Sequence, residues 1–250
     1  MMRSRKVSRV PVAEALAVCL LVCLASRAWP APPPERLMEV VLEKKTGDTI
    51  ASFDSGHVFD SGDIVRLRLR PDFDGYFYVI DLGTSGKNQL LFPRQETGTD
   101  NRVERGREYV VPATADGWFQ ISGPAGYETL YFILSPVALT GALSQALTGN
   151  QQPGNPNAGI PQGTAPGTMT SRCNDAIFKA RGECVDKTAG PKRVEPGVPL
   201  PDPVQQLIGN TPIGDGSRDL NFTHKSSSSV VTSSVPLTGP VVYEFLLAHK

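Results

Sequence analysis

Short apolar runs cut by Gly, Pro, Asp and Asn follow one another from residue 37 to residue 135, and this punctuation constrains the fold more than any other feature of the chain. In the clearest run, "DIVRLRLR", Val65, Leu67 and Leu69 alternate with three arginines. A period of two residues is typical of a strand with one buried face and one wet face. The pattern therefore predicts an antiparallel β domain.

Other runs have strand composition, and "YFYVIDL" is apolar on both faces, which predicts a central strand. The remaining candidates are "MEVVLEKK", "QLLFP", "EYVVP", "WFQI", "ETLYFILS", "RDLNFTH" and "PVVYEFLLAHK". The last two lie within residues 217–250, and the Ser-rich stretch 226–229 between them is expected to be a loop. Because an isolated hairpin is marginal in water, we expect these C-terminal strands to return to the β domain at 37–148.

Residues 149–216 interrupt the strand pattern. Their first part, 149–169, has almost no large apolar side chains and many Gly, Pro, Asn and Gln residues, so burial cannot offset the entropy of ordering it. A short helix is expected at 172–181, capped by Ser171 and stopped by Gly182, and extended irregular chain follows. We therefore predict one domain with a long, largely disordered insertion that contains a short helix.

The N-terminus predicts a secretory signal peptide at residues 1–28. Basic residues precede the apolar run "VAEALAVCLLVCLA", which is too short for a spanning helix, and the small residues Ser26 and Ala28 stand just before a cut at Trp29. Residues 29–36 then form a Pro-rich extended lead. We expect an exported protein, periplasmic or extracellular, without a membrane span after cleavage. The alternative is an uncleaved signal anchor that tethers the chain to the membrane.

Two of the four cysteines, Cys173 and Cys184, remain once the signal peptide is removed. In an oxidising compartment a disulfide is their expected state. A continuous helix would hold their Cα atoms roughly 16 Å apart, whereas a disulfide spans roughly 4.4–6.8 Å. The helix must therefore end early, at Gly182, which gives a small disulfide-closed helical loop.

Composition excludes some classes of partner. After loss of the basic leader the chain is mildly acidic, with no basic cluster and no aromatic stripe. Nucleic-acid binding depends on neutralising phosphates, and adhesion to a membrane surface depends on a polybasic segment. Neither is expected here.

The loop "GTSGK", residues 83–87, resembles a phosphate-binding loop in its glycines and lysine. A P-loop needs Gly-x-x-x-x-Gly-Lys-Ser/Thr and a following helix, but Asp81 and Asn88 occupy the two ends of that motif and a strand follows. We interpret the loop as a hairpin turn. A calcium-loop spacing around "DFDG" fails as well, because Arg70 occupies the first ligand position. No metal or cofactor is expected.

No catalytic motif is present: there is no Gly-x-Ser-x-Gly elbow, and no histidine stands beside a nucleophile. His224 and His249 end strands and are expected to be surface or edge residues. We therefore expect a protein that is not an enzyme. If a site were assembled from loops, its candidates would be His57, Asp60, Asp63 and Asp81. A deep polar cleft that joins these loops would favour a small hydrolase or carbohydrate-active domain, and a convex loop surface would favour a binding module.

Several short motifs occur together and in order within residues 58–136. They are Gly62-Asp63 before a long strand, the aromatics Tyr76 to Tyr78, "LFP" at 91–93, Asn101 and Gly106 before Tyr109 and Pro112, and the series Pro124, Gly126 and Glu128. In these motifs the segment resembles the bacterial family named domain of unknown function 4384 (DUF4384).

The resemblance implies an immunoglobulin-like antiparallel β-sandwich, found in exported proteins and as an accessory module in larger ones. It implies no established activity, and the roles it implies for Tyr76, Tyr78, Pro93 and Gly126 are structural. Taken with the absence of a catalytic motif, it favours an exported, non-catalytic module that binds another protein or a component of the cell envelope.

Overall fold

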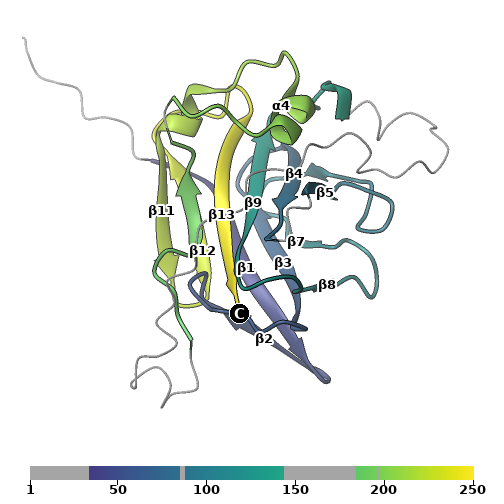
Figure 1. Ribbon diagram of the computed structural model, residues 1–250. Helices are drawn as coiled ribbons and strands as arrows, with labels where there is room; N and C mark the ends of the chain where they lie inside the picture. Colours follow the sequence, from purple (N-terminus) through teal and green to yellow (C-terminus); the bar gives the residue numbers. More distant parts are fainter. Residues whose placement is uncertain (1–33, 85–87, 144–183, 196) are drawn as a thin grey trace, which may run out of the picture. The chain divides into compact units, whose positions relative to one another are not determined.

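The computed structural model describes residues 34–84, 88–143, 184–195 and 197–250. These residues form two antiparallel β-sheets (Figure 1). The predicted all-β sandwich is therefore confirmed. The expected signal peptide, the helix at 172–181 and Cys173 lie outside the described residues, so the disulfide with Cys184 stays a prediction.

The first sheet has the strand order β11-β12-β1-β3-β7, with β2 also paired to β1 and β8 to β3. Its strands are β1 (Glu35–Thr46), β2 (Thr49–Phe53), β3 (Ile64–Pro71), β7 (Tyr109–Val111), β8 (Phe119–Gln120), β11 (Leu220–Lys225) and β12 (Ser228–Ser233). The long strand β1 pairs with β3 on one side, and with β12 and then β2 on the other. It therefore joins the N-terminal, family-like and C-terminal parts of the chain in one sheet.

The second sheet has the order β10-β13-β9-β4-β5, with β6 paired to β4. Its strands are β4 (Gly75–Leu82), β5 (Asn88–Phe92), β6 (Arg102–Val103), β9 (Gly126–Ser135), β10 (Gly190–Arg193) and β13 (Val241–His249). Because β4 and β5 are antiparallel neighbours, the loop at 83–87 connects a hairpin, as the sequence predicted. The C-terminal strand β13 lies against β9 from Val241, opposite Leu134, to His249, opposite Gly126.

The inner faces of the two sheets form one hydrophobic core. Phe132 of β9 is its centre: the ring stacks on Phe245 at 5.4 Å and packs edge-on against Phe77 and Tyr243. The alternation predicted for β3 is confirmed, since Val65, Leu67 and Leu69 are buried in this core. The arginines between them point the other way, and Arg66 and Arg68 each donate to the Glu43 carboxylate at 2.7 Å.

The expectation of a loop at 226–229 is wrong for its second half, because Ser228 and Ser229 begin strand β12. Ser226, with φ of 41°, makes the turn from β11, and the next strand pairs with both β11 and β1. Serine is small enough to fit in a strand that is paired on both sides, and its hydroxyl can find a partner there: Ser228 Oγ donates to Glu39 Oε1 at 2.7 Å. The sequence also gave no clear signal for β2, whose residues are mostly exposed.

The expectation of irregular chain is wrong for two parts of the insertion. Residues 190–193 form β10, which pairs with β13, and a helix, α4 (Asp202–Ile208), begins after Pro201 and ends at Gly209. A short 3₁₀ turn, η1 (Asp215–Arg218), follows. The helix packs Val204, Leu207 and Ile208 onto the outer face of the second sheet. Its neighbours there are Tyr78, Ile80, Tyr131, Ile133 and Val242.

Candidate functional site

A cavity of about 610 Å³, called the slot below, is lined by residues of both sheets. Its apolar lining comes from the core and includes Leu67, Leu91, Leu130 and Leu247. Beside it the edge of the first sheet is interrupted, because β7 pairs with β3 only from Leu67 onward and β8 pairs only up to Val65. The slot is therefore an opening at one end of the sandwich, with the hydrophobic core as its floor.

The polar side of the slot lies at the ends of strands β4, β9 and β13. On each strand, alternate side chains form a row that faces the core. On β4 the row runs Phe77, Val79 and Asp81. On β9 it runs Leu134, Phe132, Leu130 and Glu128, and on β13 it runs Val241, Tyr243, Phe245, Leu247 and His249. Each row is apolar along its length and ionisable at its last position, because alternate residues of a strand share a face.

The strand register brings these three end positions together. Asp81 pairs with Leu130 on β9, so it is a diagonal neighbour of Glu128 on the same face. Glu128 pairs with Leu247 on β13, so it is likewise a diagonal neighbour of His249. Two carboxyl groups and an imidazole therefore meet at the end of the second sheet.

The Asp81 carboxyl group is buried, with 9% of its surface exposed. Its Oδ2 accepts a 3.4 Å hydrogen bond from Gln89 Nε2, whereas no amide, hydroxyl or basic group of the described residues donates to Oδ1. Burial raises the pKa of Asp81 well above its ordinary value, and the charge of Glu128 and a hydrogen bond with it raise this pKa further. Asp81 therefore retains its proton at a pH where an exposed aspartate is ionised.

Glu128, by contrast, is surrounded by donors. Its Oε2 accepts from the Thr84 backbone N–H at 3.1 Å, and its Oε1 accepts from the Thr84 hydroxyl at 3.1 Å. His249 Nε2 lies 3.1 Å from the same Oε1. Both oxygens of Glu128 are therefore already used as hydrogen-bond acceptors.

The expectation that His249 is a surface or edge residue is wrong: its side chain is fully buried. The segment before β3 covers the end of β13, because Phe59 N–H donates to the Ala248 carbonyl at 2.9 Å and Lys250 N–H donates to the Phe59 carbonyl at 3.0 Å. His249 Nδ1 has no hydrogen-bond partner within the described ranges. His224 lies elsewhere, where its Nδ1 is 2.9 Å from Ser55 Oγ.

Of the four residues proposed from the sequence, only Asp81 lines the slot. Asp63 Oδ2 instead accepts from Lys44 Nζ at 2.6 Å and from the Asp60 backbone N–H at 2.9 Å. Asp60 also pairs with Lys250 at 3.4 Å. These two carboxylates therefore fix the turn before β3 and do not join a common cleft with Asp81.

His57 lies between two aromatic rings, 4.3 Å from Phe53 and 4.7 Å from Phe59 between centroids. Burial, and after it the charge of Lys44, lowers the pKa of His57 to about 4. An imidazole that stays neutral within an aromatic cluster fills space in the fold, and it has no contact with the slot.

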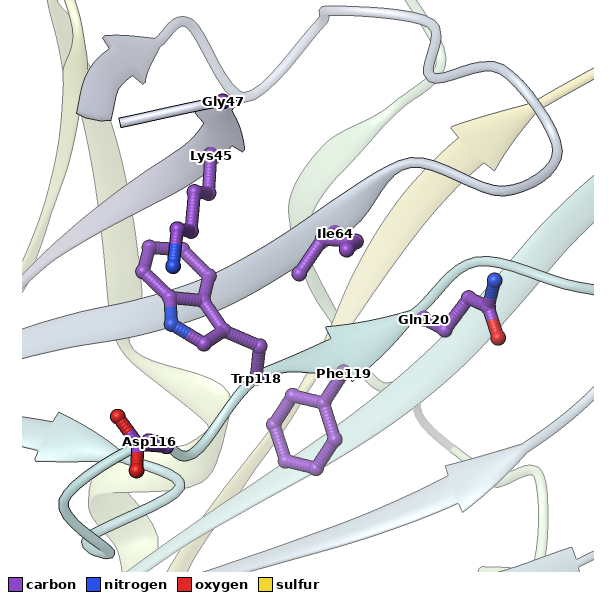
Figure 2. Close-up of a pocket in the computed structure, with 7 residues that line it drawn as sticks. All are labelled: Lys45, Gly47, Ile64, Asp116, Trp118, Phe119 and Gln120. Carbon is purple, nitrogen blue, oxygen red and sulfur yellow. The ribbon is translucent and has the colours of Figure 1, made fainter. Parts of the chain in front are cut away.

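A second, open hollow of about 490 Å³ is lined by Lys45, Ile64, Asp116 and Trp118 among others (Figure 2). The Arg66 guanidinium lies over the indole at 4.5 Å, and Lys45 Nζ lies 5.9 Å from it. Trp118, Phe119 and Gln120 line both hollows. The indole ring is therefore part of the lining of both hollows, and two cationic side chains pack against it.

Sequence reasoning missed Glu128, Gln89, Thr84, His249 and Trp118. One signal was available: in three predicted strands, the alternate residues that share one face are apolar except for an ionisable residue at one end.

The residues 34–84, 88–143, 184–195 and 197–250 contain no group of three or more His, Cys, Asp or Glu side chains that is arranged to hold a metal ion. No helix in the same ranges is long and apolar enough to cross a bilayer.

The fold and this opening define a class: an antiparallel β-sandwich with a polar slot at one end. Residues 58–138 match the family model described as Domain of unknown function (DUF4384), so this part of the chain belongs to that family and the resemblance is confirmed. No curated protein and no solved structure matches the chain. The matched segment contains Asp81, Glu128 and Trp118, whereas His249 lies outside it.

Proposed function

We propose that the chain is an exported, non-catalytic binding module whose ligand, part of another protein or of the cell envelope, enters the slot. The observation that carries the proposal is the buried Oδ1 of Asp81 in the slot lining, to which no amide, hydroxyl or basic group of the described residues donates. A buried carboxyl oxygen without such a donor costs free energy, and a ligand donor would satisfy it. The volume is also within the range of about 300–1,000 Å³ that is common for ligand pockets.

The alternative, a small hydrolase, is supported by one feature, the proton shared between two carboxyl groups. Such a pair can act as acid and base in hydrolysis. Against it, both Glu128 oxygens already accept from Thr84 or lie against His249, which leaves fewer lone pairs for an attacking water. The hydrogen-bonded pair is also closer than the roughly 5–9.5 Å that separates glycosidase carboxylates.

A photo-crosslinking amino acid at Gln120, on the exposed rim of the slot, tests the binding role. In the native cell envelope we expect a discrete crosslinked product whose amount saturates with expression. The matched control places the same probe at Lys187, an exposed residue outside the slot lining, and should give no such product. Equal crosslinking from both positions would overturn the proposal.

The hydrolase alternative has its own test. Purified full-length chain is incubated with peptide and polysaccharide substrates at acidic and neutral pH. We expect no turnover. Turnover that is lost in Asp81→Asn, while the variant remains folded by circular dichroism, would show that the module is an enzyme.

Export is tested separately by intact mass spectrometry of the chain recovered from cells. We expect a mature N-terminus at Trp29. Digestion without reductant should also give one peptide pair linked through Cys173 and Cys184. A full-length mass would indicate an uncleaved anchor, and two free thiols after export would exclude the bridge.

A further inference from the structure

We propose that the slot binds a primary ammonium group on an aliphatic stem, the chemistry shared by a lysine side chain and a free alkylamine. The proposal rests on the binding role above and adds the chemical class of the ligand. It follows from three features: the carboxyl groups at the polar end of the slot, the apolar side chains of its walls, and the hydrogen bonds that the Asp81 and Glu128 oxygens already accept.

The polar end has an acceptor that lacks a donor. Asp81 Oδ1 is buried and receives no hydrogen bond from an amide, hydroxyl or basic group of the described residues, and Glu128 from the neighbouring strand is hydrogen-bonded to the same carboxyl group. Two carboxyl groups this close cannot both ionise without a cation between or beside them. An ammonium group supplies up to three donors and one positive charge, so it can replace the shared proton and leave both groups ionised.

No basic group among the described residues near this point reaches Asp81 Oδ1. Arg66 is the one basic residue in the slot lining, and its guanidinium is already bound to Glu43 at 2.7 Å and stacked on Trp118. His249 on β13 approaches Glu128 with Nε2. Gln89 contributes only a neutral amide to Asp81, and Arg94, whose Nη1 lies 3.5 Å from the Gln89 amide oxygen, is paired with Glu96 at 2.7 Å. None of these groups brings a full positive charge to Asp81 Oδ1.

An ammonium fits this end better than a guanidinium. The planar fork of arginine binds a carboxylate best through both of its oxygens. Both oxygens of Glu128 already accept from Thr84, and Oδ2 of Asp81 already accepts from Gln89. A compact point charge needs only the one free oxygen.

The walls of the slot fit the stem. Leu67, Leu91, Leu130 and Leu247 line it, and methylene groups gain free energy when they leave water for such a surface. Phe119 and Trp118 line the mouth. A polyhydroxylated sugar could stack on Trp118 but would leave its hydroxyls against the leucines, so we favour the aliphatic amine.

Isothermal titration of the full chain with pentylamine tests the inference. We expect binding on the order of 1 mM or tighter, the range for a ligand of this size, and release of the proton held by Asp81. Asp81→Asn should weaken binding at least tenfold and abolish the proton release. Asp60→Asn removes an exposed carboxylate outside the slot and should change neither. Pentanol, which has the same stem without the charge, should bind at least tenfold more weakly.

The two sources are separated by comparing pentylamine with a Lys-containing tripeptide and its Nε-acetylated form. Tighter binding of the tripeptide, lost on acetylation, assigns the site to a partner's lysine, whereas tighter binding of pentylamine assigns it to a free amine. Equal binding of pentanol and pentylamine, or Asp81-dependent binding of a neutral sugar, would overturn the inference. If no amine binds while the crosslink at Gln120 persists, the ligand class is wrong and the binding role stands; loss of the crosslink alone would count against the binding role.

Discussion

The same three strands, β4, β9 and β13, form two different environments along their length. In the middle of the sandwich their inward side chains are aromatic and aliphatic, and Phe132 contacts three other rings. At the end beside the slot the same rows finish in Asp81, Glu128 and His249, which are buried or nearly so. The first region follows the rules of stable packing, whereas the second buries ionisable groups at a cost.

This contrast separates the side chains that stabilise the fold from those that the fold does not require. An apolar residue at each of the three end positions would continue the core and remove the cost of desolvation. The ionisable residues at the polar end therefore lower the stability of the fold, and residues that do so are candidates for a functional role. The four predictions below test this division, from the largest expected effect to the smallest.

Phe132→Ala should cause the largest loss. It removes a fully buried ring from the centre of the core, and such truncations cost about 3–5 kcal/mol. The free energy of unfolding from urea titration measures the loss. Phe132→Leu, which retains most of the volume, should cost markedly less. A loss below about 1 kcal/mol would show that the middle of the sandwich is not the tightly packed region.

Asp81→Asn should have the opposite effect at neutral pH and stabilise the protein by about 1–3 kcal/mol, because the amide is neutral in both states, whereas the carboxylate of the unfolded chain must take up a proton or be buried with its charge. The folded-state pKa of Asp81 is raised by burial and by Glu128. Its contribution to stability is therefore complete below the ordinary carboxyl pKa and is lost as the pH rises through the folded-state value.

Urea midpoints of the wild type and Asp81→Asn at pH 4 and pH 7.5 give the measurement. The gain should be present at pH 7.5 and small at pH 4. Asp63→Asn is the matched control, since Asp63 has a lysine partner and its loss should destabilise. A variant less stable than wild type at pH 7.5 would show that Asp81 is a structural residue.

A substitution at His57 tests whether this residue, a candidate site residue proposed from the sequence, stabilises the fold and has no part in ligand binding. Its folded-state pKa, lowered to about 4, lies below the ordinary histidine value near 6.5. Between these values the unfolded chain binds the proton and the folded chain does not, so stability falls as the pH falls through this window. After allowance for solvent screening the loss amounts to about 1–2 kcal/mol.

His57→Gln should flatten this part of the pH–stability curve, measured in the Asp81→Asn background so that the two opposite titrations do not overlap. Binding of any slot ligand should be unaffected. A change in ligand affinity would mean that the two regions communicate.

The strands could be predicted because their information is local: an alternation such as that of Val65, Leu67 and Leu69 fixes which face is buried. The slot could not, because Asp81 and Glu128 meet only through the register of β4 and β9, and His249 joins them only because β13 pairs with β9 across an insertion. The helix α4 was hidden for a different reason: prolines at 201 and 203, which suggest irregular chain, also suit the start of a helix.

The smallest effect is expected at Tyr243, whose hydroxyl is a polar group within the apolar core. Its ring is fully buried between Phe132 and Phe222, and its hydroxyl has no partner in the part of the chain that the structure describes. Unlike Asp81 Oδ1, this oxygen is not in the slot lining, so no ligand there can satisfy it. Tyr243→Phe should therefore be neutral or stabilise by up to about 1 kcal/mol. Tyr131→Phe is the matched control, since it loses a 2.7 Å hydrogen bond to Glu244 and should destabilise by about 1 kcal/mol. If Tyr243→Phe destabilises as much as Tyr131→Phe, the hydroxyl has a partner after all and the centre of the sandwich is not dry.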